Sequence, residues 1–218
     1  VQVAFRATEI ILGWIIHLVP LAVFGVIARV VGEQGLAPLR GLAVYVGVAI
    51  LGLALHIGLV YQFWIVVIAR DSLVRFWRGA SDAVVYALGA SSSLATLPVT
   101  LKAIDRLGIS PASGRMAACV GTNFNNDGIL LYEAMAVLFV AQVHGIHLSL
   151  GGQVSAALAC VVAGVGIAGV PEAGLISLSL VLATVGLPVE ILPLLLTVDW
   201  ILSRARAATN VVSDILVA

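Results

Sequence analysis

The feature that most constrains this chain is a set of polar residues near its C-terminus, placed inside a segment that is otherwise apolar enough for a membrane. At 100° per residue, five of them fall within about 80° of arc on one helix face: Asp199, Ser203, Arg206, Asn210 and Asp214. An ionisable side chain at bilayer depth costs roughly 2.5–3.5 kcal/mol unless it faces a cavity or a partner. One polar face on an apolar helix therefore predicts a ligand or ion pathway.

The composition of the whole chain agrees with a membrane location. Of its 218 residues, 61% are hydrophobic and only 10% are charged. Soluble domains average about 25% charged residues, so we predict a polytopic membrane protein with lipid as a partner. The net charge is zero and there is no basic arm, so no nucleic-acid partner is expected. Because the first residue is Val1 rather than Met, we expect a fragment or a processed chain.

Two uncharged segments open the chain, residues 10–28 and 41–69. Each is long enough to cross a hydrocarbon core of about 30 Å, so we predict two antiparallel spans with a short charged connection between them. His56 lies inside the second span and has no polar companion at helical spacing. We therefore expect His56 to be a hydrogen-bonded packing residue.

The next uncharged segment, residues 83–101, is flanked by basic residues on both sides. A membrane span would leave these basic residues on opposite sides of the membrane, which the positive-inside rule disfavours. A re-entrant hairpin returns to the side it left, so both basic clusters could be cytoplasmic. Its middle, Gly89–Pro98, contains a glycine, a serine run and a proline, all of which weaken a helix. We predict a hairpin over residues 72–106 with Ser91 to Ser93 at its tip.

A broken span is predicted over residues 112–143, because Gly121–Gly128 contains three asparagines, an aspartate and two glycines. An unwound turn there could offer backbone carbonyls and the Asp127 carboxylate to a hard cation. Glu133 lies on nearly the same face seven residues after Asn126. It is either a proton carrier or a hydrogen-bonded structural residue, and both interpretations stay open.

A second hairpin and a last broken span complete the expected fold. Residues 149–187 carry a glycine-rich apex with a proline, and residues 191–218 carry the polar face. Hairpin and broken span then alternate twice from opposite sides of the membrane. The predicted fold class is an all-α membrane protein with four transmembrane spans and two re-entrant hairpins, arranged as an inverted repeat.

Four motifs resemble the glutamate transporter family, also called dicarboxylate/amino acid:cation symporters. They are Ser91–Pro98, Asn125–Gly128, Gly166–Pro171 and Asp199–Asp214, in register from about residue 10 to the end. The resemblance implies two hairpin tips that enclose substrate in a domain moving like an elevator against a trimeric scaffold. It implies that residues 1–40 are scaffold-like and residues 41–218 form the transport domain, corresponding to the fifth to eighth of the eight family spans.

The resemblance also implies the binding residues. Substrate contacts are expected at Ser92, Ser93, Gly169, Ser203, Arg206 and Asn210. Sodium ligands are expected at Gly121, Asn125, Asp127, Gly164, Val165, Ile167, Asn210 and Asp214. Arg206 matches the arginine that pairs with the distal carboxylate of acidic substrates, and its planar fork suits a carboxylate. Glu133 matches a glutamate that carries a proton in some members. Sodium is the expected coupling ion, with no organic cofactor.

Departures from the family pattern bear on the substrate. Ser203 stands where amino-acid carriers usually place an aspartate for the substrate ammonium, and carriers of C4-dicarboxylates resemble this chain in having serine there. Ile129 and Asn126 replace a threonine and a methionine of the family pattern, which affects a substrate contact and the surroundings of the sodium sites. Arg204 lies off the polar face and is expected to be a structural or interfacial residue.

Three classes of function follow from these observations. The first is a sodium- or proton-coupled carrier of C4-dicarboxylates or acidic amino acids in the plasma membrane, a homotrimer at full length and not an enzyme. The second is a non-transporting, truncated or partner-dependent subunit of such a carrier. The third is an intramembrane hydrolase, for which the sequence supplies neither a Gly-x-Ser-x-Gly turn nor a histidine base near the serines.

Overall fold

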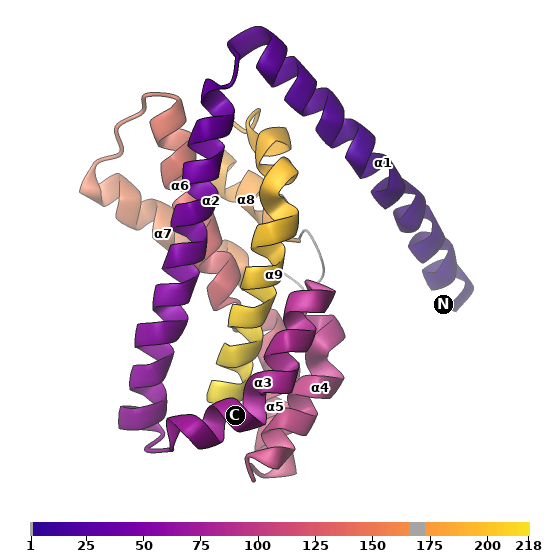
Figure 1. The fold of residues 1–218 in the computed structure, drawn as a ribbon, viewed down its shortest axis with the longest axis vertical. Coiled ribbons are helices and arrows are strands. Elements are labelled where there is room, and N and C mark those ends of the chain that lie inside the picture. The colour runs from indigo at the N-terminus through magenta and orange to yellow at the C-terminus, as the bar shows by residue number, and fades with distance from the viewer. Residues whose placement is uncertain (1, 166–172) are drawn as a thin grey trace.

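The computed structural model of the protein describes residues 2–165 and 173–218, and within these ranges the regular structure is entirely helical (Figure 1). The expected all-α class is confirmed. The elements are α1 (Gln2–Gln34), α2 (Ala37–Leu55), the π-helical turns η1 (His56–Tyr61) and η2 (Trp64–Ile68), α3 (Leu73–Ala90), α4 (Ser93–Arg106), α5 (Pro111–Phe124), α6 (Asp127–Val143), α7 (Leu150–Gly164), α8 (Ala173–Thr184) and α9 (Leu192–Leu216).

Helix α9 lies at the centre of the molecule and contacts α1 to α6, η1 and α8 (Figure 1). Its N-terminal half joins one buried apolar cluster with α2, α6, α7 and α8, which includes Leu195 and Leu202. Its C-terminal half joins a second cluster with η1, α3, α4 and α5, which includes Ala207 and Ile215. The polar face of α9 therefore runs past the boundary between two apolar cores.

The structure contradicts one expected feature of this helix. Residues 191–218 were predicted to form a broken span, but α9 is continuous from Leu192 to Leu216. Its only proline, Pro193, stands in the first turn, where proline is tolerated, and the helix contains no glycine. Its buried polar side chains pair within α9, as Asp199 and Arg206 do, or with neighbouring helices, as Asn210 does, while the helix stays unbroken.

The first hairpin is formed by α3 and α4, which meet at Ser91 and Ser92. Ser91 ends α3 in the left-handed conformation with φ +53°, and the Ser92 hydroxyl caps α4 by accepting a hydrogen bond from the Ala95 N–H at 3.1 Å. A two-residue connection makes the helices antiparallel, as Figure 1 shows in magenta. The tip lies within the serine run, where the sequence predicted it.

Helices α5 and α6 are separated at Asn125 and Asn126, inside the predicted interruption. Helices α7 and α8 lie against each other where the second hairpin was expected. The apex between them, residues 166–172, lies outside the described residues and so do two expected ligands, Gly169 and Ile167.

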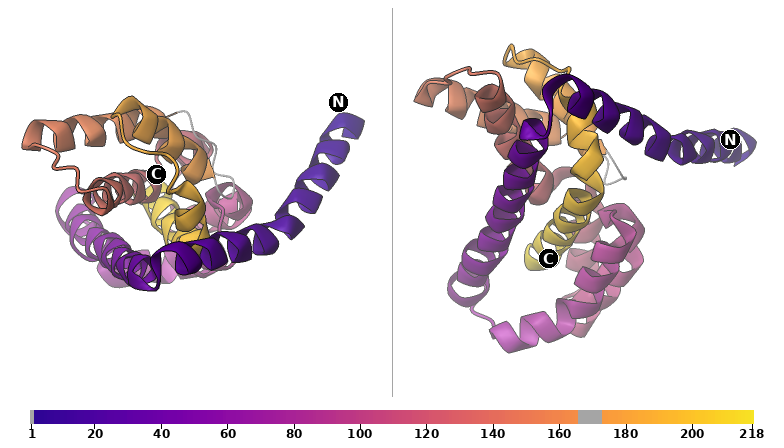
Figure 2. Two further views of the ribbon diagram at one scale, coloured as in Figure 1. Left: turned by 90° about the horizontal axis from the view of Figure 1, so that it is seen from above. Right: turned by 45° about the horizontal axis from the view of Figure 1, so that its top comes forward.

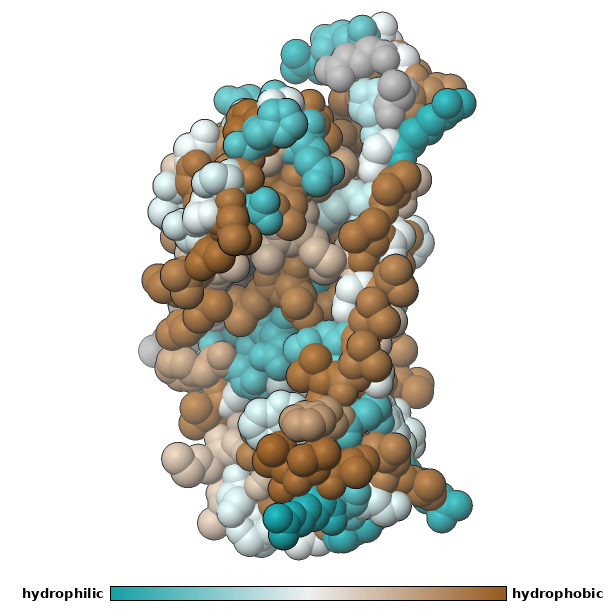
Figure 3. Space-filling model, turned by 90° about the vertical axis from the view of Figure 1, so that its left-hand side faces the viewer, coloured by the Kyte–Doolittle hydropathy of each residue, from teal (hydrophilic) through white to brown (hydrophobic). Residues whose placement is uncertain are grey.

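Helix α2 and the π-helical turns η1 and η2 form one long apolar helical segment, Pro38–Ile68. Its outward face is apolar, with a stripe at helical spacing made of Val44, Val48, Leu51 and Leu55. Apolar side chains also cover much of the face drawn in Figure 3. Surface of this kind suits lipid or a protein partner better than water.

Helix α1 ends at the turn around Gly35, and its N-terminal part points away from the other helices, as all views in Figures 1 and 2 show. It does not pack along α2 as the expected antiparallel pair would. By length and composition, two helical stretches of the described residues could cross a membrane, Pro38–Ile68 and Pro111–Val143. The full set of four spans and two re-entrant hairpins therefore stays a prediction.

Candidate functional site

All five polar residues aligned on α9 are buried, as the cost of exposing them to lipid requires. They are Asp199, Ser203, Arg206, Asn210 and Asp214. Asp199 and Arg206 pair with each other within α9, whereas Asn210 and Asp214 have partners at the break between α5 and α6.

Arg206 is held on three sides near the middle of α9. Its Nη1 and Nη2 lie 2.9 and 3.0 Å from the two carboxylate oxygens of Asp199, two turns earlier on the same helix. Its guanidinium stacks over the Tyr132 ring of α6, 4.0 Å from the ring centroid. On a further side it faces Gly174 of α8, where an added Cβ would lie 3.1 Å from Nη1. The guanidinium is therefore fixed in orientation at the junction of α6, α8 and α9.

Asn210 connects α9 to the start of α6. Its Oδ1 accepts a hydrogen bond of 2.7 Å from the Gly128 N–H, and its Nδ2 donates to Asn126 Oδ1 at 3.3 Å. Gly128 has to be glycine, because an added Cβ would lie 2.6 Å from the Arg206 carbonyl oxygen. The approach of α6 to α9 therefore depends on one missing side chain.

Asn126, which departs from the family pattern, is fully buried and extends this connection to the second hairpin. Its Nδ2 donates to the carbonyl oxygens of Asn123 at 3.1 Å and Gly164 at 3.2 Å. Gly164 was expected to offer its carbonyl to sodium, and here that oxygen accepts from Asn126. The next expected ligand, Val165, is exposed at the end of α7, where its N–H bonds to the Val161 carbonyl.

Asp214 and its neighbours form one oxygen-rich site. Asn125 Nδ2 donates to Asp214 Oδ1 at 3.2 Å, and a Cβ on Gly121 would lie 2.3 Å from the same oxygen. Asp214 Oδ2 is buried and has no hydrogen-bond partner among the described residues. The close approach of the Gly121 backbone to Oδ1 requires glycine at that position. The unpaired Oδ2 is a carboxylate oxygen that fits a hard cation, which prefers oxygen ligands.

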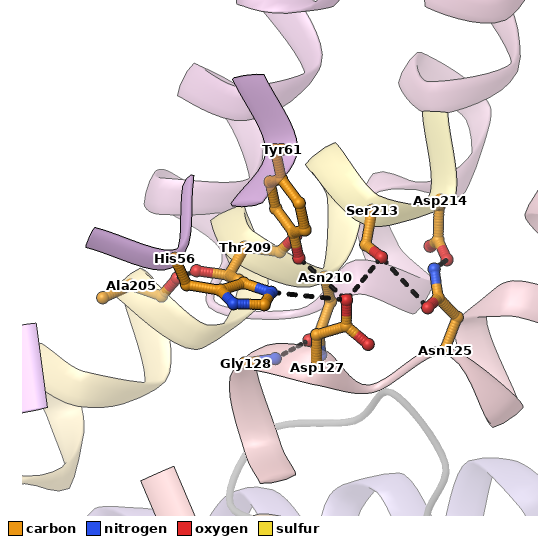
Figure 4. A network of polar contacts seen from close by, with 10 residues as sticks. All are labelled: His56, Tyr61, Asn125, Asp127, Gly128, Ala205, Thr209, Asn210, Ser213 and Asp214. Atoms are coloured by element: carbon orange, nitrogen blue, oxygen red, sulfur yellow. Dashed lines mark hydrogen bonds and ion pairs between the residues drawn. The ribbon is translucent and has the colours of Figure 1, made fainter. Parts of the chain in front are cut away.

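Asp127 is the centre of a second polar cluster, drawn in Figure 4. Its Oδ2 accepts hydrogen bonds from Tyr61 Oη at 3.0 Å and from Ser213 Oγ at 2.8 Å, and His56 Nε2 lies 3.7 Å away. Ser213 Oγ also lies 3.0 Å from Asn125 Oδ1, which connects this cluster to the Asp214 site. His56 was expected to be a packing residue, but it stands beside a carboxylate.

The π-helical turn η1 explains how His56 and Tyr61 reach one carboxylate. Residues five apart in an α-helix are separated by about 140°, whereas i→i+5 hydrogen bonding brings them one turn apart. Gln62 supports this wide turn, because its Nε2 donates to the Ile57 carbonyl at 2.8 Å and its Oε1 accepts from Trp77 of α3 at 3.0 Å.

The remaining expected residues lie around these clusters. Ser93 is buried at the start of α4, and the Ser92 hydroxyl is engaged as the helix cap. Ser203 is buried on α9, and its hydroxyl donates to the Trp200 carbonyl at 3.4 Å. Glu133 is fully buried in α6, and its Oε1 accepts a hydrogen bond from Ser177 of α8. It therefore meets the second hairpin directly.

Arg204 has the structural position that the sequence suggested. It is exposed, and its Nη1 donates to the carbonyl oxygens of Leu88 at 2.9 Å and Gly89 at 3.2 Å, at the end of α3. Cations at a helix C-terminus are stabilised by its unpaired carbonyls. Arg204 thus fastens α9 to the first hairpin near its tip.

Comparison with known proteins gives concordant matches. A profile of the sodium:dicarboxylate symporter family matches residues 1–218. The excitatory amino acid transporter of Caenorhabditis elegans is 41% identical over 176 residues, covering 80% of this chain and 35% of the relative. Human excitatory amino acid transporter 2 is 41% identical, with 80% and 31% covered, and mouse excitatory amino acid transporter 3 is 37% identical, with 95% and 40% covered. The chain spans about a third of the length of the curated relatives it matches.

Proposed function

The chain belongs to the sodium:dicarboxylate symporter family, and from this premise we propose that it forms the substrate- and cation-binding part of a secondary transporter for C4-dicarboxylates or acidic amino acids. The family is one of transporters, so the protein is an integral membrane protein. Coupling to sodium, elevator-type movement of residues 41–218 against a scaffold, assembly as a homotrimer and residence in the plasma membrane are parts of this proposal.

The observation that carries the proposal is the position of Arg206. Its guanidinium already binds one carboxylate through two nearly equal contacts, to Asp199 at 2.9 and 3.0 Å. A guanidinium carries five N–H donors, so its other edge can bind a second carboxylate, that of the substrate. Its charge is offset by Asp199 and its plane is held by Tyr132, which supports a preorganised anion site rather than a mobile surface charge.

Ser203 decides the choice of substrate within this proposal. A hydroxyl cannot neutralise the ammonium group of an α-amino acid, so its presence on the face of Arg206 and Asn210 favours a C4-dicarboxylate. The names of the relatives, which are excitatory amino acid transporters, favour an acidic amino acid instead. We favour the C4-dicarboxylate, because Ser203 belongs to this chain's own site.

The cation half of the proposal rests on the two oxygen-rich clusters. Gly121, Asn125, Asn210 and Asp214 would hold one sodium ion, and Asp127 belongs to another site. The unpaired Asp214 Oδ2 supports the first assignment. Glu133 contacts Ser177 of the second hairpin. Protonation of Glu133 would therefore change a contact between α6 and the second hairpin.

The experiment that tests the substrate assignment is a calorimetric titration of the purified protein with succinate and with L-aspartate, in sodium chloride and in choline chloride. We expect sodium-dependent binding with succinate the tighter ligand, and Ser203→Asp should shift the preference toward aspartate. Ser81→Asp is the matched control, because Ser81 is an exposed serine of α3. Equal binding in sodium chloride and choline chloride would contradict the sodium dependence. A preference for succinate over aspartate that is unchanged in Ser203→Asp would contradict the substrate assignment.

A further inference from the structure

We propose that a basic hollow at one end of the first hairpin binds the phosphate group of an anionic phospholipid. The hollow has a volume of about 420 Å³, within the range of small-ligand pockets, roughly 300–1,000 Å³. It lies between the first half of α3 and the end of α4, and six residues line it: Ser72, Val74, Arg75, Arg78, Gly79 and Arg106. None of them belongs to the proposed substrate and cation sites, so this inference goes beyond the proposed function.

The geometry of the hairpin explains why three arginines gather there. Arg75 and Arg78 lie about 60° apart around α3, so both side chains leave the helix on one side. Gly79 is buried on the same side, where an added Cβ would lie 2.6 Å from Leu107 Cδ2. The missing side chain lets the end of α4 pack closely against α3, which brings Arg106 to the other two arginines.

Two of the three arginines have acidic partners. Nη1 of Arg75 lies 3.4 Å from Asp71 Oδ1, and Arg106 pairs with Asp82. Arg78 is exposed, and no ion pair joins it to an acidic side chain in the described part of the chain. Three guanidinium groups against two carboxylates leave one positive charge in excess, which matches the single negative charge of a phosphodiester.

The start of α3 adds donors that suit the same group. Ser72 is the N-cap of this 18-residue helix, and its side chain makes no cap hydrogen bond. Its N–H donates to Asp71 Oδ1 at 2.7 Å, whereas the N–H groups of the following turn have no partner within the helix and carry partial positive charge. Phosphate oxygens in the hollow would accept from these groups and from the planar forks of the arginines.

The surroundings of the hollow favour a lipid over a free anion. Val74, which lines it, is exposed, and so are Val67 and Ile68 at the end of the preceding apolar segment. That segment, Pro38–Ile68, is long and apolar enough to cross a membrane. Its end, the start of α3 and the end of α4 lie together at the lower end of the molecule in Figure 1. The hollow therefore lies where a span would leave the bilayer, at the level of lipid phosphates, and basic pockets at such positions bind anionic headgroups.

The test measures binding of a soluble short-chain lipid. The midpoint of thermal unfolding of the purified protein in neutral detergent is measured against the concentration of dioctanoyl phosphatidylglycerol. Dioctanoyl phosphatidylcholine and inorganic phosphate are titrated in parallel at the same ionic strength. We expect the midpoint to rise with the anionic lipid alone, because only this ligand combines a net negative charge with acyl chains for the apolar surface beside the hollow.

One variant and one matched control locate the site. Arg78→Gln should weaken the apparent affinity for phosphatidylglycerol about fivefold, as expected for one basic residue near an anionic membrane surface. Because Arg78 is exposed, the midpoint of this variant without lipid should equal that of the wild type. Arg40→Gln, at an exposed arginine near the other end of the segment Pro38–Ile68, should stay within twofold of the wild-type affinity.

Each outcome supports or overturns the proposal. A rise with phosphatidylglycerol that Arg78→Gln weakens and Arg40→Gln preserves supports it. An equal rise with inorganic phosphate would overturn the lipid as the occupant of the hollow. Equal responses to the two lipids, or equal losses in the two variants, would overturn the site itself. All titrations use one fixed sodium concentration and no succinate, so a failure here leaves the proposed transport function untouched.

Discussion

The Asp199–Arg206 ion pair is buried, so removing one charge should be costly. Asp199→Asn keeps the side-chain shape but leaves Arg206, whose side chain is 4% exposed, without its carboxylate. Breaking a buried pair in this way costs about 3–5 kcal/mol. The cation–π contact with the Tyr132 ring offsets only about 2 kcal/mol of the cost of burying the Arg206 charge. This contact is present in both the wild type and the variant, so it does not reduce the difference in stability between them. At roughly 2–4 °C per kcal/mol for a chain of this size, the unfolding midpoint should fall by roughly 6–20 °C. Circular dichroism during heating in detergent measures this shift.

Two further variants make the result interpretable. Asp82→Asn breaks the ion pair with Arg106, whose side chains are 58% and 53% exposed, and surface pairs contribute about 0–1 kcal/mol. Its midpoint should fall by no more than roughly 4 °C. Asp199→Asn combined with Arg206→Gln removes both buried charges and should recover much of the loss. A shift for Asp199→Asn no larger than that for Asp82→Asn would show that the Asp199–Arg206 pair contributes no more than a surface ion pair.

Two more changes have expected outcomes. Gly121→Ala should weaken sodium binding about tenfold, because its Cβ would displace the Asp214 carboxylate, whereas Gly47→Ala, where an added Cβ meets nothing within 4 Å, should leave the rise of the unfolding midpoint with sodium chloride concentration unchanged. Gln62→Leu should destabilise the protein by about 1–3 kcal/mol, because the Ile57 carbonyl loses its side-chain partner, and hydrogen exchange should quicken locally around η1. Unchanged exchange at η1 would show that Gln62 does not support the wide turn.

Local sequence signals located the helices well where the backbone itself decides their ends. The serine run predicted the first hairpin tip, since Ser91 adopts a left-handed conformation and Ser92 caps the next helix. The Asn125–Asn126 break follows from the concentration of asparagine and glycine there. The predicted break in the last span was wrong, because α9 has no glycine and no proline beyond its first turn, and its polar residues pair along the unbroken helix or with other helices.

The side chains around Asp127 illustrate a different limit. In a regular α-helix, His56 and Tyr61 would be separated by about 140° and would point to different faces. They share a face only because the π-helical turn adds a residue to that turn of the helix, which α-helical spacing does not predict. Ser213 could have been found, since it lies about 60° from Asn210 around α9. The Asp199–Arg206 pair was also accessible, because the two residues are two turns apart on the same face. Contacts within one regular helix are thus predictable, and contacts that depend on an irregular turn are not.

Arg206 on α9 is proposed to bind the carboxylate of an acidic substrate in the presence of sodium. The most direct measurement is the calorimetric affinity for succinate in sodium chloride of the wild type, Arg206→Ala and Arg204→Ala. Arg206→Ala should lose a charge-assisted bidentate contact worth about 2–3 kcal/mol, a weakening of succinate binding of roughly 30- to 150-fold. Arg204→Ala, at an exposed arginine that contacts the end of α3, should stay within about threefold of the wild type. Equal effects of the two arginines, or binding of succinate unchanged in Arg206→Ala, would contradict the proposed role of Arg206.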